Sequence, residues 1–147
     1  MKKDKDAKKA RIDIRLVKDW PAPEIIALYE AAGWWDGSTK SSVKNNISGS
    51  FAFAVAVDSE TGKAVGMGRV LSDGVSDAYV QDVIVLPAYR KQDIGKKIIS
   101  ALLGECAKKN VSWVSLIAES GTIDFYSGLG FKVMKGHTPM KYQGGQK

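Results

Sequence analysis

The chain has 147 residues, the length of one domain, and it can bury about two-thirds of its unfolded surface without disulfide staples. A single cysteine excludes an intramolecular disulfide, and no signal peptide or membrane-spanning apolar run is recognised, so we expect a cytoplasmic protein. The net charge is +6, but residues 1–11 carry +4 of it. We therefore predict a mobile basic tail over residues 1–11 and one nearly neutral domain over residues 12–147.

The first half of the chain predicts a strand, two helices and a hairpin. Residues 12–16 alternate between apolar and polar types, which is typical of a strand. A helix is predicted to open at two prolines and to end at a glycine, over residues 21–33, and a second helix to cover residues 41–48. Residues 51–57 and 63–71 are expected to pair as a hairpin.

The middle of the chain predicts a strand, a basic turn and a helix. Residues 79–86 are rich in β-branched and aromatic types and are stopped by Pro87. Apolar residues recur with helical spacing over residues 94–109. The turn at residues 90–92 supplies basic side chains where unpaired N–H groups and the helix dipole also converge. This arrangement indicates a site for a pyrophosphate.

The last third predicts a strand over residues 112–118, a short helix over residues 121–129, and closing strands over residues 131–134 and 138–142. Together these elements predict an α/β fold of the α+β kind, in which helices flank a central mixed, mostly antiparallel sheet.

Two motifs in order narrow the class of protein. The turn lacks both the nucleoside-triphosphate pattern G-x-x-x-x-G-K-[ST] and the dinucleotide pattern G-x-G-x-x-G. Its spacing resembles [Q/R]-x-x-G-x-[G/A], with Arg90, Asp93 and Gly95 at the defined positions and Asp93 in place of the glycine. Further on, residues 118–131 read A-E-S-G-T-I-D-F-Y-S-G-L-G-F. In both motifs the chain resembles the GCN5-related N-acetyltransferase (GNAT) family, which usually has glycine where Asp93 stands. The resemblance covers nearly all of residues 12–142.

The resemblance implies acetyl-coenzyme A as co-substrate and transfer of its acetyl group to the amine of a small molecule or a protein. In the family, the pantetheine arm pairs with backbone at the end of the strand before the loop. The cofactor-binding residues that follow from the resemblance are Val83, Ile84, Val85, Arg90, Lys91, Gln92, Asp93, Ile94, Gly95, Lys96 and Phe125.

Two residues are candidates for catalysis. Tyr126 matches the tyrosine that usually serves the family as the acid for the leaving thiolate, although a phenol there can also position the sulfur or simply pack. Asp82 stands on the strand before the loop, where a carboxylate can act as a base or hold the acceptor's ammonium group. Glu119 is a candidate for the acceptor side, with capping of the short helix as its alternative.

Trp34 and Trp35 are adjacent in a loop between two predicted helices. In the family this region forms part of the acceptor wall, and an aromatic pair can hold a cationic group by cation–π contact. The alternative is that at least one of the two rings packs into the core. No metal is expected, because the single histidine, His137, and the single cysteine, Cys106, offer no ligand spacing.

The leading hypothesis is therefore an acetyl-CoA-dependent N-acetyltransferase. The alternative from another class is a non-catalytic acyl-CoA-binding sensor or interaction module of the same fold, which the acidic residue in the cofactor loop favours. A nucleic-acid-binding domain is the third hypothesis, and the neutral body of the chain speaks against it. Nucleic acid and membrane are not expected as partners, and a homodimer is one assembly open to the chain.

Overall fold

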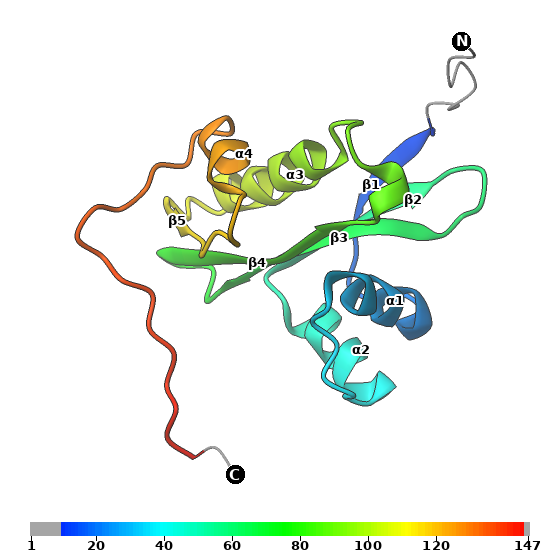
Figure 1. The fold of residues 1–147 in the computed structure, drawn as a ribbon, viewed down its shortest axis with the longest axis horizontal. Helices are drawn as coiled ribbons and strands as arrows, with labels where there is room; N and C mark the ends of the chain where they lie inside the picture. Colours follow the sequence, from blue (N-terminus) through cyan, green and yellow to red (C-terminus); the bar gives the residue numbers. More distant parts are fainter. Residues whose placement is uncertain (1–9, 146–147) are drawn as a thin grey trace. The chain divides into compact units, whose positions relative to one another are not determined.

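A mixed sheet forms the centre of the first of two compact units, which comprise residues 1–115 and residues 116–147. The computed structural model describes residues 10–145, so most of the predicted tail lies outside the described residues. Within that part of the chain the sheet has five strands in the order β1-β2-β3-β4-β5; β1 to β4 pair antiparallel and β5 runs parallel to β4 (Figure 1). The strands are β1 (Ile12–Leu16), β2 (Ala52–Asp58), β3 (Ala64–Ser72), β4 (Asp77–Val85) and β5 (Trp113–Ser115).

Helices cover both faces of this sheet. The helices α1 (Ala22–Ala32) and α2 (Lys40–Gly49) lie on one face and α3 (Ile94–Lys108) lies on the other, while the short 3-10 helix η1 (Pro87–Tyr89) follows β4 (Figure 1). As predicted, α1 ends at Gly33, which has a left-handed φ of 75°. These elements confirm the predicted fold class. Among the described helices none has the length and apolar character needed to cross a membrane.

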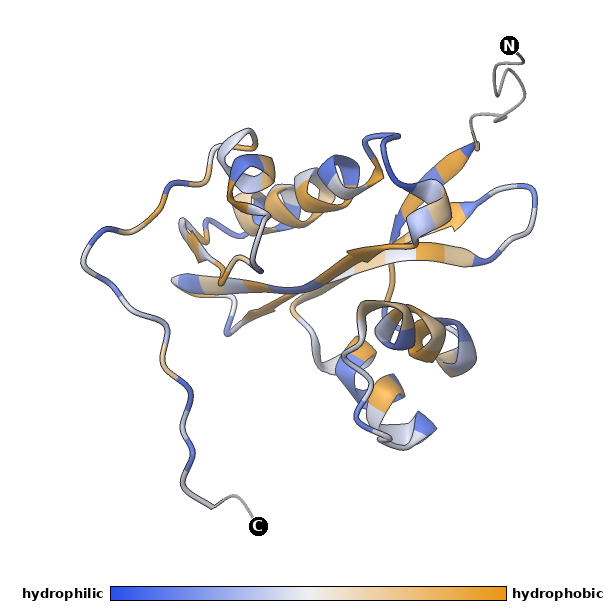
Figure 2. Cartoon of the chain, in the orientation of Figure 1, coloured by the Kyte–Doolittle hydropathy of each residue, from blue (hydrophilic) through white to orange (hydrophobic). Residues whose placement is uncertain are grey.

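The sheet buries different kinds of side chain on its two faces. Every residue of β2 is buried, and its larger side chains, Phe53, Val55 and Val57, belong to the core under α1 and α2. The residues between them are the alanines Ala54 and Ala56, and their partners on β3 are Gly68 and Gly66. Hydrophobic residues accordingly run along the strands of the sheet (Figure 2). The face with the small residues is the one that α3 covers.

The glycines of β3 allow α3 to approach the sheet closely. A methyl group added at Gly68 would lie 2.9 Å from Cγ2 of Ile98 and 3.2 Å from Cδ1 of Leu102, both on α3. These two α3 side chains are fully buried. Glycine in a strand interior marks such a close approach, and here it sets the height of α3 above the sheet.

The second unit, described over residues 116–145, contains one short helix, α4 (Ile123–Ser127), and otherwise turns and extended chain. The predicted closing strands over residues 131–134 and 138–142 are wrong for this structure, because a strand needs a ladder partner and these backbone groups have none in the described sheet. A turn closed by the His137 N–H and the Met134 carbonyl separates them instead. The single-domain boundary stays a prediction.

The close approach of α3 predicts opposite effects for two Gly→Ala substitutions. Gly68→Ala is expected to lower the free energy of unfolding by about 1 to 3 kcal/mol, because the added methyl overpacks against α3. Gly104→Ala, on the exposed side of α3 with nothing within 4 Å of the added methyl, is expected to raise it by about 0.4 to 1 kcal/mol. Urea unfolding measures both values. Equal effects would contradict the proposed approach of α3.

Candidate active site

The loop from β4 to α3 is held in a defined backbone conformation. After η1, the Arg90 Nε donates a hydrogen bond to the Val85 carbonyl at 3.1 Å, which ties the loop back to the end of β4. Lys91 and Asp93 both have left-handed backbones, with φ values of 64° and 61°. Two left-handed residues so close together turn the chain sharply into α3.

The N-terminus of α3 presents free donors at the end of this loop. The hydrogen bond from the Lys97 N–H to the Asp93 carbonyl, 3.1 Å long, begins the helical ladder. The N–H groups of residues 94–96 come before that ladder, so they have no carbonyl one turn earlier within the helix. Together with the helix dipole and the basic side chains of the loop, they favour an anionic ligand.

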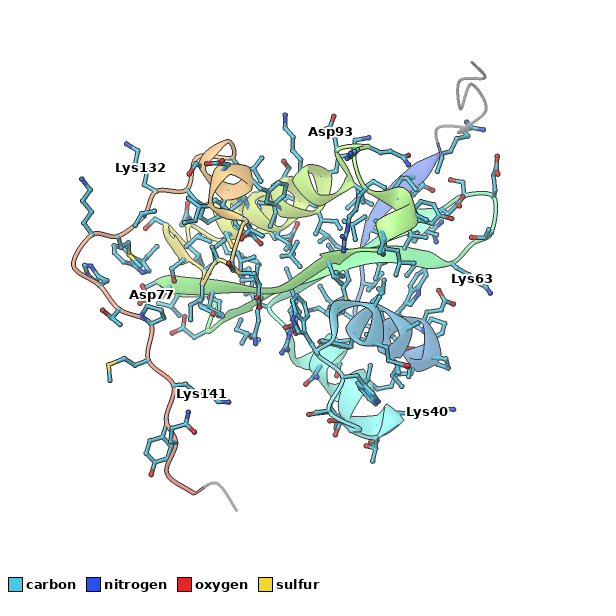
Figure 3. All side chains as sticks on the ribbon, viewed as in Figure 1. Lys40, Lys63, Asp77, Asp93, Lys132 and Lys141 are labelled. Atoms are coloured by element: carbon cyan, nitrogen blue, oxygen red, sulfur yellow. The ribbon has the colours of Figure 1, made fainter. Side chains whose placement is uncertain are left out.

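Asp93 occupies the position where the family usually has glycine, and its backbone adopts the conformation that glycine favours. Its side chain makes no cap to the helix and lies exposed at the outer edge of the loop (Figure 3). The departure from the family therefore keeps the backbone geometry and adds a negative charge. Beside it, Oε1 of Gln92 is buried with no hydrogen-bond partner among the described residues.

A tyrosine–aspartate contact anchors the start of the loop. The hydroxyl of Tyr89 donates to Oδ2 of Asp58 at 2.7 Å, and Oδ1 of Asp58 accepts from the Glu60 N–H at 2.9 Å. The hydrogen bond from Tyr89 is the main cause that lowers the pKa of Asp58, and the same bond raises the pKa of Tyr89. One carboxylate thus joins the turn after β2 to the loop that precedes α3.

The strand β4 has a backbone edge that the sheet leaves unpaired. Its pairing with β5 covers Asp77 to Tyr79 only, so residues 80–85 have no strand partner on that side among the described residues. This edge leads directly into the loop before α3. An extended ligand can add to such an edge by main-chain hydrogen bonds. The side chain of Ile84 is buried, so the strand itself is firmly seated.

The other edge of β4 contains a bulge. Met67 pairs with Ile84 and Arg69 pairs with Gln81, so residues 82–83 of β4 stand opposite the single residue Gly68 of β3. Asp82 has a left-handed φ of 58° within the strand.

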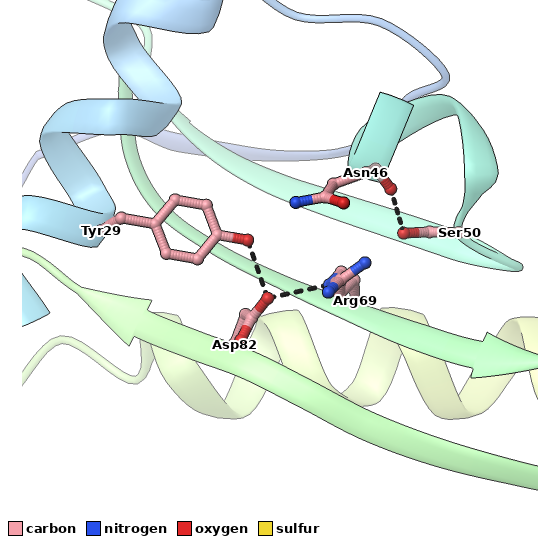
Figure 4. A network of polar contacts seen from close by, with 5 residues as sticks. All are labelled: Tyr29, Asn46, Ser50, Arg69 and Asp82. Atoms are coloured by element: carbon pink, nitrogen blue, oxygen red, sulfur yellow. Dashed lines mark hydrogen bonds and ion pairs between the residues drawn. The ribbon is translucent and has the colours of Figure 1, made fainter. Parts of the chain in front are cut away.

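The Asp82 side chain joins three elements. Its Oδ2 accepts a hydrogen bond from Nε of Arg69 on β3 at 2.8 Å and another from the hydroxyl of Tyr29 on α1 at 2.7 Å (Figure 4). Burial is the main cause that raises the pKa of Tyr29, and the hydrogen bond to Asp82 raises it further. Tyr29 is therefore a neutral donor throughout the physiological range.

In the second unit, Tyr126 lies on α4 between two aromatic neighbours. The ring centroids of Phe125 and Tyr126 are 4.9 Å apart and those of Tyr126 and Phe131 are 5.7 Å apart, both with edge-to-face geometry. The Phe131 N–H donates to the Tyr126 carbonyl, which closes the L-G-F turn. Burial and, after it, the negative charge of Glu119 raise the pKa of Tyr126.

Trp34 and Trp35 are half-buried and pack against the core under α1 and α2. The ring of Trp35 lies 6.4 Å from the ring of Tyr29, centroid to centroid. The structure therefore supports the packing alternative for both rings, and their place in an acceptor wall stays a prediction.

Residues 82–96 all belong to the first unit, and their role in cofactor binding stays a prediction. Glu119, Phe125 and Tyr126 belong to the second unit, and their position against the first-unit residues stays a prediction. Sequence reasoning missed four residues that hold this region together: Tyr29, Asp58, Arg69 and Tyr89. The sequence contained a signal for one of them, Arg69. It follows G-M-G in an otherwise apolar strand, a pattern that marks a close approach followed by a buried charge.

The comparisons with known proteins agree with this geometry. The model of the acetyltransferase (GNAT) domain matches residues 49–133, more than half of the chain. The chain is 37% identical over 70 residues to the chloroplastic GCN5-related N-acetyltransferase 2 of Arabidopsis thaliana, a match that covers 48% of this chain and 27% of the plant protein. The chain thus spans well under half the length of that relative.

Two solved structures have the same fold. A GNAT family acetyltransferase from Streptococcus pneumoniae TIGR4 superposes with a TM-score of 0.77 at 28% identity, over 92% of this chain and 100% of that one. An aminoglycoside N-acetyltransferase in complex with CoA superposes with a TM-score of 0.70 at 15% identity, over 91% and 96% of the two chains. The chain belongs to the GNAT family of acetyltransferases.

The contact between Tyr89 and Asp58 predicts a pH-dependent difference between the wild type and Tyr89→Phe. The folded-state pKa of Asp58 is lowered, so the stability from this contact is present above the unfolded carboxyl pKa of about 3.9. It is lost as the pH falls through the lower folded-state value. Melting temperatures from pH 2 to pH 8 should show Tyr89→Phe below the wild type at neutral pH, with the gap closing in acid. A gap that is constant with pH would contradict the assignment.

Proposed function

We propose that this protein transfers the acetyl group of acetyl-CoA to an amine of a small molecule or a protein. The proposal is supported by membership in the GNAT family and by one structural observation above the others. The unpaired edge of β4 runs directly into the free N–H groups at the start of α3. Acetyl-CoA has an extended pantetheine arm joined to a pyrophosphate, so its site needs these two features next to each other.

The residues present fit such a ligand. Arg90 and Lys91, together with the N–H groups of residues 94–96, form a donor set suited to a pyrophosphate. The backbone of residues 83–85 offers main-chain pairing to the pantetheine arm, because β5 leaves that side of β4 open. Gln92, Asp93 and Phe125 complete the proposed cofactor-binding residues.

When bound, acetyl-CoA supplies a thioester that an amine can attack. The acceptor must first lose a proton, which costs about 4.6 kcal/mol at pH 7 for an alkylamine of pKa about 10.4. An N–H on the free edge of β4 would donate to the thioester oxygen from a position fixed by the sheet. This chain thus contributes orientation and a preorganised hydrogen bond.

Tyr126 is the proposed donor of the proton that the departing thiolate needs. Burial and the neighbouring Glu119 raise the pKa of its phenol, so it is protonated at neutral pH. The same shift makes the phenol a weaker acid and the proton transfer more uphill, so a position close to the sulfur would have to compensate. Trp34, Trp35 and Glu119 are proposed for the acceptor side.

The runner-up is a non-catalytic acyl-CoA-binding sensor of the same fold. The exposed negative charge of Asp93 beside the proposed pyrophosphate site favours it, because that charge lowers the affinity for an anion. Release of CoA thiol with a panel of amines separates the two: turnover supports the enzyme, and tight binding without turnover supports the sensor. A cytoplasmic location and a homodimer stay predictions.

Substitutions in the loop test the placement of the pyrophosphate. Arg90→Ala is expected to weaken acetyl-CoA binding by about 1 to 3 kcal/mol, the loss of one charge-assisted hydrogen bond. Asp93→Asn, which keeps tolerance of the left-handed backbone and removes the charge, should strengthen binding, and Asp93→Gly should do the same. Calorimetry measures all three. Unchanged affinity in Arg90→Ala would contradict the placement of the pyrophosphate at this loop.

Tyr126→Phe tests the proposed acid. A phenol that protonates the leaving thiolate matters only as the carbon–sulfur bond breaks, so turnover should fall by about 100-fold while the dissociation constant of the cofactor changes little. Tyr142→Phe, an exposed tyrosine of the same unit, is the matched control and should leave turnover unchanged. A Tyr126→Phe protein with full turnover and a lowered melting temperature would assign Tyr126 a packing role.

A further inference from the structure

We propose that Tyr29, Arg69 and Asp82 form a clasp that sets the bulge of β4, and that Asp82 is a positioning residue for the cofactor-binding strand instead of the base. The inference deepens the proposed function and rests on it for its catalytic consequence. Its structural part, the dependence of the bulge on the clasp, is independent of any reaction.

The bulge is a strained feature that needs outside support. Asp82 adopts a left-handed backbone, with φ 58°, in the middle of a nine-residue strand. Such a conformation costs free energy for any residue other than glycine, and it persists only where the surrounding structure fixes it. Bulges with a left-handed residue ordinarily use glycine at that position. An aspartate there calls for a contact that its side chain alone can make.

The clasp supplies that contact from two sides. Arg69 comes from β3, the strand across the bulge, and Tyr29 comes from α1, which covers the sheet. Both hydrogen bonds end on the same oxygen, Oδ2 of Asp82, and the side chains of Arg69 and Asp82 are only 13% and 15% exposed. A largely buried ion pair with a further donor fixes the direction of the carboxylate. Figure 4 shows the three side chains converging over the strands.

The bulge controls where the proposed cofactor atoms meet the strand. Gln81 pairs with Arg69, and the next residue, Asp82, also turns its side chain to Arg69, so two consecutive side chains face the same side of the sheet. The alternation of side chains between the two faces of the sheet therefore shifts by one residue just before Val83. The main-chain groups proposed to hold the pantetheine arm begin at that residue, so the clasp decides which of them point to the free edge.

The same contacts argue against Asp82 as the base. Its Oδ2 accepts from a guanidinium and from a phenol, and a proton taken up there would displace both donors. Loss of those bonds would release the bulge at the moment when the strand must be held. A positioning residue instead keeps both hydrogen bonds, from Arg69 and from Tyr29, throughout the reaction.

Three substitutions at Asp82 separate the two roles. Asp82→Asn keeps an acceptor oxygen and tolerance of the left-handed backbone but cannot serve as a base. As a positioning residue it should keep turnover within about 10-fold of the wild type, with an unchanged pH profile of kcat/KM, whereas loss of a base costs about 100- to 10,000-fold. Asp82→Gly allows the left-handed backbone but removes the carboxylate that Arg69 and Tyr29 bind. Asp82→Ala removes the carboxylate and also disfavours the left-handed backbone. We expect these two to lose turnover and cofactor affinity by about 10- to 100-fold.

Amide hydrogen exchange of the protein without ligand tests the clasp apart from the reaction. Tyr29→Phe should speed exchange at Val83 and Ile84 by about 10-fold, since it removes one of the two hydrogen bonds that support the bulge. Tyr89→Phe is the matched control, because it deletes a tyrosine hydroxyl bound to a different aspartate at the same distance of 2.7 Å. Because it destabilises the fold without touching the bulge, it should speed exchange at Val83 and Ile84 by less than Tyr29→Phe does.

The outcomes distinguish a failed clasp from a failed function. If exchange at Val83 and Ile84 is the same in Tyr29→Phe as in the wild type, the clasp is overturned, whatever the activity. If Asp82→Asn loses turnover and the acid limb of its pH profile while exchange stays normal, Asp82 is the base and the proposal is wrong. Wild-type protein that transfers acetyl to no amine overturns the proposed function, and the exchange data still decide whether the clasp sets the bulge.

Discussion

The pairing of β3 with β4 is the constraint on which the other features of the first unit depend. Two residues of β4 stand opposite Gly68 of β3, and the same glycine lets Ile98 and Leu102 of α3 descend onto the sheet. A larger residue there would push α3 away and with it the helix N-terminus that presents the N–H groups. The register of this strand pair therefore sets which backbone groups of β4 face away from β3 and how closely α3 packs on the sheet.

Two tyrosine–aspartate hydrogen bonds support β4, one within the strand and one beyond its end. The bond from Tyr29 to Asp82 connects α1 to the middle of β4, and the bond from Tyr89 to Asp58 connects the end of β2 to the loop after β4. Each raises the pKa of its tyrosine, so both phenols stay neutral donors over the whole physiological range. The strand is thus held at the bulge and just beyond its end, while residues 80–85 have no strand partner on the β5 side among the described residues.

Local signals in the sequence predicted the helices and the loop, because each depends on residues close together in the chain. Gly33 ends α1 as expected, and the strand–turn–helix around Arg90 is present. The bulge was not predicted, since it arises from a register between two strands and alternation within one strand does not reveal it. The closing strands failed for a related reason: residues 131–142 have the right alternation but no partner within the described sheet. Pairing is a property of two segments, and a pattern in one segment cannot specify it.

Asp93 keeps the backbone conformation that the motif requires at this position but adds a negative charge that glycine lacks. The loop requires a left-handed residue before α3, which glycine provides at the lowest cost and which aspartate tolerates better than most other residues. The substitution therefore leaves the N–H groups of α3 in place and changes only the field that they present. A carboxylate beside these donors opposes an anionic ligand, and Arg90 and Lys91 of the same turn oppose the carboxylate. We expect the balance of these charges to set the affinity of the loop for an anion.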